Sequence, residues 1–143
     1  MPVYREDKSD VITILGRKEL RPALDDTKRP IPDSIPETLY FFMPDGTRMA
    51  LPSDKEIIIG RRPRPEDPPV TIDLENYQGH ELGVSRQHAL LKVFKGALIL
   101  VDLDSVNGTY VNEQRAMPLK RYAILDGSSI RLGGVTIKMR FNP

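Results

Sequence analysis

The pattern of hydrophobic and polar residues changes near residue 39 and predicts a series of β-strands from there on. Short runs rich in Val, Ile, Leu, Phe and Tyr are separated by Gly, Pro, Asp and Asn, as in a chain of strands joined by turns. In residues 135–141 apolar and polar side chains alternate, which indicates a strand with one buried face. The pattern predicts strands at residues 39–43, 48–51, 56–60, 70–74, 89–94, 97–102, 109–112 and 135–141.

Turn residues between these runs indicate how the strands are joined. Pro44-Asp45-Gly46 separates the first two runs, and Lys95-Gly96 separates the runs at 89–94 and 97–102, so the sequence predicts a hairpin at each place. About ten or eleven strands at close spacing, without helical periodicity, predict an all-β fold: a sandwich of two antiparallel sheets. Loops gather at the two ends of a sandwich, and binding residues are expected there.

Residues 1–37 differ from the rest in carrying five prolines, fifteen charged side chains and one short apolar run, at residues 11–15. A segment with so little to bury is expected to be largely disordered. We therefore expect a polar N-terminal tail at 1–37 followed by one domain at 38–143. A strand at residues 11–15 or a short helix at residues 17–24 remains open.

Composition narrows the classes of function. The 143 residues include 21 Lys and Arg against 20 Asp and Glu, for a net charge of +1, so the overall charge favours neither nucleic acid nor an anionic membrane as a partner. There are no cysteines, which excludes thiolate metal sites and cysteine catalysis and fits a reducing compartment. No stretch approaches the ~18 apolar residues of a membrane span. We expect a cytoplasmic protein.

Three short motifs follow one another at the ends of predicted strands. They are Gly60-Arg61, then Ser85-Arg86-Gln87-His88, then Asn107-Gly108-Thr109 with Asn112 after it. Each motif alone is common, but the set in this order resembles the signature of the forkhead-associated (FHA) domain family. The resemblance covers about residues 39–141. It implies an FHA/SMAD-like sandwich that recognises phosphothreonine without catalysis.

The resemblance also implies roles for individual residues. Phosphothreonine carries about −1.5 to −2 charges and three acceptor oxygens, so a site for it needs fixed cations and donors. By resemblance, Arg61, Ser85 and Arg86 bind the phosphate. By resemblance, Asn107 holds the main chain of the peptide, and Val106, where the family often has Thr, helps to bind the residues that flank the phosphothreonine. Structural support of the loops falls to Gly60, His88, Gly108 and Asn112.

This interpretation predicts an adaptor in Ser/Thr kinase signalling, with no cofactor and no metal. Its partners would be Thr-phosphorylated proteins, either substrates of a kinase or the kinase itself. One alternative is an FHA fold that serves as a phosphate-independent scaffold or dimerisation domain. Another is nucleic-acid binding through Arg61-Arg62-Pro63-Arg64, which the neighbouring Glu66 and Asp67 disfavour.

Two kinds of chemistry are disfavoured by the sequence. A hydrolase would pair Ser85 or Ser105 with His88 and Asp102 or Asp104, but Ser85 lacks the Gly-x-Ser-x-Gly setting of such nucleophiles. Metal binding would rest on His80 and His88 without a third ligand.

The tail suggests one further hypothesis. Thr27 lies in the polar segment ahead of a predicted phosphothreonine reader. If a kinase modified it, the tail could occupy the site of its own domain.

Overall fold

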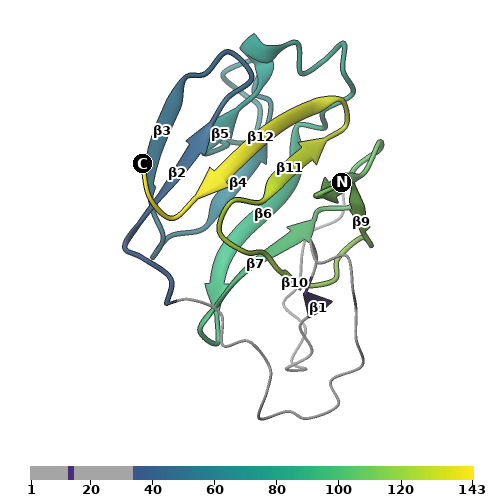
Figure 1. The fold of residues 1–143 in the computed structure, drawn as a ribbon. Helices are drawn as coiled ribbons and strands as arrows, with labels where there is room; N and C mark the ends of the chain where they lie inside the picture. Colours follow the sequence, from purple (N-terminus) through teal and green to yellow (C-terminus); the bar gives the residue numbers. More distant parts are fainter. Residues whose placement is uncertain (1–12, 15–33) are drawn as a thin grey trace.

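The computed structural model describes residues 13–14 and 34–143, which form two β-sheets packed face to face (Figure 1). The first sheet has the strand order β1-β10-β7-β6-β4-β5. Its strands are β1 (Thr13–Ile14), β4 (Ile57–Gly60), β5 (Ile72–Asp73), β6 (Gln87–Phe94), β7 (Ala97–Asp102) and β10 (Tyr122–Ala123).

The second sheet has the order β3-β2-β12-β11-β8-β9. Its strands are β2 (Thr38–Phe42), β3 (Arg48–Pro52), β8 (Thr109–Val111), β9 (Gln114–Ala116), β11 (Ser129–Leu132) and β12 (Val135–Arg140). In Figure 1 the yellow β12 crosses in front of β4 and β6. The described residues also include a short 3-10 helix at Glu75–Tyr77. The predicted all-β sandwich is confirmed.

Alternation along the strands builds the core between the two sheets. On β2, Leu39 and Phe41 are fully buried while their neighbours are partly exposed. On β12, Val135, Ile137 and Met139 are buried and the residues between them are exposed. These side chains meet Leu91, Leu98 and Leu100 of the first sheet in one cluster. The period of two in the sequence is therefore the period of burial in the fold.

Strand β7 breaks this alternation because it is buried on both faces. Leu98 and Leu100 enter the main core, whereas Ile99 and Val101 join a second apolar cluster with Leu90 on the other face of the first sheet. Its unbroken apolar run in the sequence reflects this double burial.

Parallel pairs occur at both edges of the first sheet: β4 with β5, and β1 with β10. The other pairs are antiparallel. Strand β1 (Thr13–Ile14) falls within the apolar run at residues 11–15. The helix considered at residues 17–24, and Thr27, lie outside the described residues. None of the described helical residues forms a segment long and apolar enough to cross a membrane.

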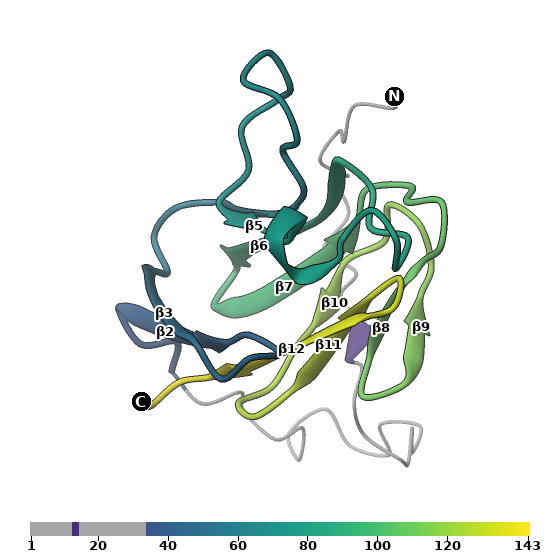
Figure 2. The same cartoon turned by 90° about the horizontal axis from the view of Figure 1, so that it is seen from above.

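Three loops lie at the same end of the sandwich. They are residues 61–71 between β4 and β5, residues 74–86 between β5 and β6, and residues 103–108 between β7 and β8. The first projects from the body of the domain in Figure 2. The turn between β11 and β12 meets the second loop, where the Gly134 amide donates to the Leu82 carbonyl at 2.7 Å. The sheets thus bring together segments that are far apart in the sequence.

Replacement of Phe41 by Ala should lower the free energy of unfolding by about 3–5 kcal/mol, because the ring is fully buried between the sheets and its loss leaves a cavity. Chemical denaturation measures the change. In the control variant Val93→Ala the side chain is 37% exposed, and a change within about 0.5 kcal/mol is expected. Equal losses in the two variants would contradict the assignment of the core.

Candidate functional site

Arg61 follows β4 directly and is held at two points. Its backbone N–H donates to the Arg86 carbonyl at 3.1 Å, and its Nε donates to the Val84 carbonyl at 2.7 Å. The side chain is 18% exposed. The guanidinium is therefore fixed by its Nε, while its two terminal nitrogens keep donors for other acceptors.

Gly60 lets β4 approach the loop that carries Ser85 and Arg86. A Cβ atom at this position would lie 2.0 Å from the Arg86 carbonyl oxygen, a distance that no side chain tolerates. The register of β4 against β6 also shifts between Ile59 and Gly60. This glycine places Arg61 beside Ser85 and Arg86.

Ser85 and Asn107 connect the second and third loops. The Ser85 Oγ accepts the Val106 backbone N–H at 3.2 Å, so its own hydroxyl hydrogen can still be donated. The Asn107 Nδ2 donates to the Gly83 carbonyl at 3.0 Å. Gly83 has a φ of +83°, and a Cβ there would lie 2.4 Å from that Nδ2. Between these contacts, Val106 is 85% exposed.

His88 is fully buried beneath the two loops. Its Nδ1 accepts the Ser85 backbone N–H at 3.0 Å, so the proton of the neutral ring is on Nε2, which donates to the Gly108 carbonyl at 2.9 Å. Burial lowers the pKa of His88 below its ordinary value, although the Gly108 carbonyl and the charge of Asp102 oppose this. Because both ring nitrogens are used by the backbone, the hydrolase arrangement considered from the sequence is not formed.

Asp102 shapes the third loop. It is almost fully buried at the end of β7. Its carboxylate accepts hydrogen bonds from the hydroxyls of Ser105 and Thr109, both at 2.6 Å, and from the Ser105 N–H at 3.1 Å. The Ser105 Oγ in turn accepts the Gly108 N–H at 3.0 Å. From the sequence, Asp102 was a candidate only for a catalytic acid, but the Asp-x-x-Ser spacing at a strand end is also a turn signal.

Two carboxylates that the motifs did not indicate face the arginines. A terminal nitrogen of Arg61 lies 3.7 Å from Glu75 Oε2, and that buried oxygen has no hydrogen-bond partner among the described residues. Arg86 donates to Asp67 Oδ1 at 3.0 Å. Burial would raise the pKa of Asp67, but hydrogen bonds from the Arg86 guanidinium and the Arg64 backbone bring it below its usual value. Each candidate phosphate-binding arginine therefore already faces a negative charge.

The other arginines of the first loop are turned back on that loop. Arg62 donates to the Asp67 and Pro65 carbonyls at 3.0 and 2.6 Å. Arg64 lies within 4 Å of the carboxylates of Glu66 and Asp67. This run of arginines is thus largely engaged by its own loop.

The other two motif residues, Gly108 and Asn112, lie in turns and stabilise them. Gly108 has a φ of +87°, a conformation that favours glycine. Asn112 has a φ of 47° in the turn between β8 and β9, where its Oδ1 accepts the Ser129 N–H at 2.9 Å. Gly108 borders the loops, whereas Asn112 ties this turn to β11.

The site thus gathers Arg61, Ser85, Arg86, Val106 and Asn107 from three loops at one end of the sandwich. Its donors suit an anion followed by an extended chain. No group of three His, Cys, Asp or Glu side chains that could hold a metal ion occurs in residues 13–14 and 34–143.

Comparison with known proteins matches the sequence model of the FHA domain to residues 57–133. Protein FraH of Nostoc sp. (strain PCC 7120) is 31% identical over 83 residues, which are 58% of this chain and 28% of FraH. The chain thus spans little more than a quarter of that relative.

Solved structures share the fold. One, from a structural and functional study of phosphothreonine-dependent FHA domain interactions, is 29% identical with a TM-score of 0.57, over 74% of this chain and 98% of the other. The FhaA FHA domain complexed with the intracellular domain of Rv3910 is also 29% identical, with a TM-score of 0.55, over 71% and 99%.

The buried neutral state of His88 should make the unliganded fold sensitive to acid. Because the folded pKa lies below the ordinary 6.5, the unfolded chain binds more protons just below that pH, and the free energy of unfolding should fall as pH decreases from about 7 to about 5.5. Urea denaturation across this range measures the slope. His88→Gln should be less stable at neutral pH and should show a smaller slope. An unchanged slope in His88→Gln would show that other groups cause the pH dependence of the free energy of unfolding.

Proposed function

The chain belongs to the FHA domain family, and we propose that it binds phosphothreonine in an extended segment of a partner protein. The observation that carries this proposal is the joining of Arg61, Ser85 and Asn107 at one end of the sandwich by direct hydrogen bonds between their loops. Donors that are held before the ligand arrives lose little freedom on binding.

In this proposal the phosphate lies between Arg61, Ser85 and Arg86. Arg61 supplies its terminal N–H donors, and Ser85 supplies its hydroxyl hydrogen. Arg86 is 46% exposed and stays partly engaged by Asp67, so it contributes less than Arg61. Hydrogen bonds to a charged group contribute roughly 1.5–3 kcal/mol each.

Asn107 and Val106 would hold the peptide beside the phosphothreonine. The Nδ2 of Asn107 is used by Gly83 through one hydrogen, which leaves its second hydrogen and its carbonyl oxygen for a peptide main chain. The exposed Val106 side chain offers an apolar contact. The two comparison structures at 29% identity, one of them from work on phosphothreonine-dependent interactions, support this reading.

The protein would act as an adaptor in Ser/Thr kinase signalling, with a phosphorylated substrate or the kinase itself as its partner. We assign it no catalytic role, since His88 is committed to the backbone. The same proposal places the binding domain at residues 38–143, and the lack of cysteines fits a cytoplasmic location. The alternative is a scaffold or dimerisation domain that binds independently of phosphate.

A phosphothreonine peptide selected from an oriented library should bind, and its unphosphorylated and phosphoserine forms should bind much more weakly. Arg61→Ala should weaken binding by at least about tenfold, because the loss of one charge-assisted contact of ~1.5 kcal/mol has that effect. Fluorescence anisotropy measures the affinities, with Lys55→Ala as the control that removes a cation outside the site. Equal binding of the phosphorylated and unphosphorylated peptides would favour the phosphate-independent scaffold.

Arg86→Ala should weaken binding of the same peptide by roughly threefold, less than Arg61→Ala does, because part of the charge of Arg86 is already balanced by Asp67. It should also lower the Tm, since the buried Asp67 loses its Arg86 partner. Anisotropy and thermal unfolding measure the two effects. A loss of affinity as large as that of Arg61→Ala would show that Arg86 leaves Asp67 when the ligand binds.

A further inference from the structure

The outer face of the second sheet carries cations and aromatic rings. Burial alternates along β2, β3 and β12, and the less buried residue of each alternation points outward. No outward position on the described strands of this sheet carries a carboxylate. Five outward positions carry cations: Arg48, Arg115, Arg131, Lys138 and Arg140. A chain with a net charge of only +1 thus segregates positive charge on this face.

Pairing registers bring three of these cations together. Phe42 of β2 is paired with Arg48 on one side and with Lys138 on the other, and Tyr40 is paired with Arg140. The Arg48 guanidinium lies 5.7 Å from the centre of the Tyr40 ring, and that of Arg140 lies 5.6 Å from the centre of Phe42. The rings therefore support the guanidiniums from the side of the sheet. We call Arg48, Lys138 and Arg140 the basic strip.

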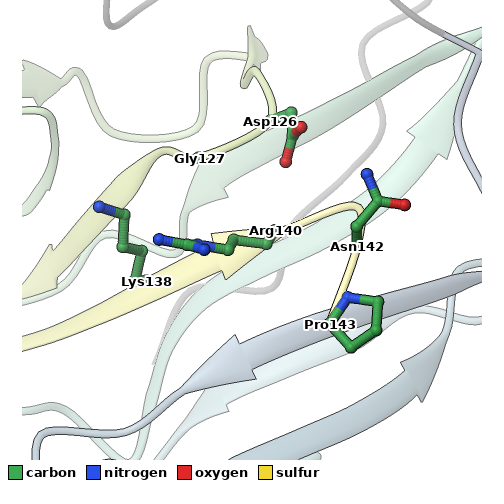
Figure 3. A pocket seen from close by; sticks show the side chains of 6 residues that line it. All are labelled: Asp126, Gly127, Lys138, Arg140, Asn142 and Pro143. Atoms are coloured by element: carbon green, nitrogen blue, oxygen red, sulfur yellow. The ribbon is translucent and has the colours of Figure 1, made fainter.

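No carboxylate in the described part of the chain forms an ion pair with the basic strip. Arg131 differs, because it is paired with Glu113 at 3.1 Å and lies over Tyr110. Figure 3 shows Lys138 and Arg140 next to each other on β12, at the side of a cavity of about 310 Å³. Asp126 also lines it, but its Oδ1 accepts the Phe141 N–H at 2.8 Å. Neighbouring like charges repel each other, and an anionic ligand would relieve this repulsion.

We propose that the basic strip binds an extended acidic segment of a partner protein, with carboxylates at alternate positions. Lys138 and Arg140 are two residues apart on one strand, which separates their Cα atoms by about 6.6 Å, and an extended peptide presents the Cα atoms of every second residue at the same spacing. Charge complementarity specifies the sign of the ligand, and the spacing of the two strand positions is the basis for its alternating pattern.

The rings argue for a polypeptide rather than single-stranded nucleic acid. Binding of single strands relies on aromatic faces on which bases can stack. A guanidinium lies within 6 Å of the centre of each of the rings of Tyr40 and Phe42, which reduces the room for a stacked base, whereas the guanidiniums keep donors for carboxylates. The surface also lies apart from the phosphate site: β12 starts at the turn that contacts Leu82, and Arg140 is at its other end. The proposal is therefore independent of phosphothreonine binding.

The test uses the full chain and a fluorescein-labelled, unphosphorylated peptide in which Glu alternates with Ser. We expect binding at low ionic strength that weakens as salt is added. The double variant Lys138→Glu/Arg140→Glu should reduce the affinity by at least about tenfold. The matched control Lys55→Glu/Lys120→Glu changes the net charge equally outside the second sheet and should reduce it much less. Arg61→Ala should leave it unchanged.

Three further measurements complete the test. A peptide with the same Glu residues in one block should bind more weakly than the alternating peptide. The neutral variant Lys138→Gln/Arg140→Gln should also lose affinity for the alternating peptide. It replaces Lys138→Glu/Arg140→Glu in the test if circular dichroism shows that the charge-reversed variant does not fold. Failure of the alternating peptide to bind, or equal losses in the two reversed variants, would overturn the proposal. So would tighter binding of an oligothymidylate or of phosphatidylserine vesicles that depends on Lys138 and Arg140.

Discussion

One buried imidazole links the parts of the candidate site. His88 accepts the Ser85 N–H on one side and donates to the Gly108 carbonyl on the other, so the second and third loops share one rigid ring. A protonated ring could not accept from Ser85. Burial keeps the ring neutral, and the neutral ring keeps Ser85 at the right distance from Val106. The position of the candidate phosphate-binding residues thus depends on a residue that need not touch the bound peptide.

The charges around Arg61 and Arg86 show how such a site can exist without its ligand. Two arginines close together repel each other, yet Glu75 and Asp67 lie beside them. These carboxylates hold the guanidiniums in the absence of phosphate. An incoming dianion would find the Arg61–Glu75 pair only partly formed, at 3.7 Å, whereas Arg86 is already hydrogen-bonded to Asp67 at 3.0 Å. The local balance also explains why the composition, with its net charge of +1, did not reveal an anion site.

The sequence was informative where a pattern or a motif is local. The alternation in β2 and β12 and the run of β7 predicted strands that the fold contains, and the motifs pointed to loops that the fold brings together. The sequence did not indicate β9, β10 or β11 individually. Strands β9 and β10 are two or three residues long, and Asn112-Glu113 forms the β8–β9 turn with positive φ at both residues, without a glycine to mark it. The ion pairs of Arg61 with Glu75 and of Arg86 with Asp67 were not predicted, because ion pairs between loops follow from the packing of the sheets.

Strand β1 has a consequence for the boundary of the domain. It pairs in parallel with β10, and β10 would otherwise be the outermost strand on that side of the first sheet. An uncovered edge presents free N–H and C=O groups on which another molecule can add a strand. A polypeptide shortened to begin at residue 38 would keep every loop of the candidate site but would leave this edge open. Residues 13–14 therefore cover an edge on which another strand could add, and the smallest unit that keeps the loops of the candidate site is not the smallest unit in which this sheet edge is covered.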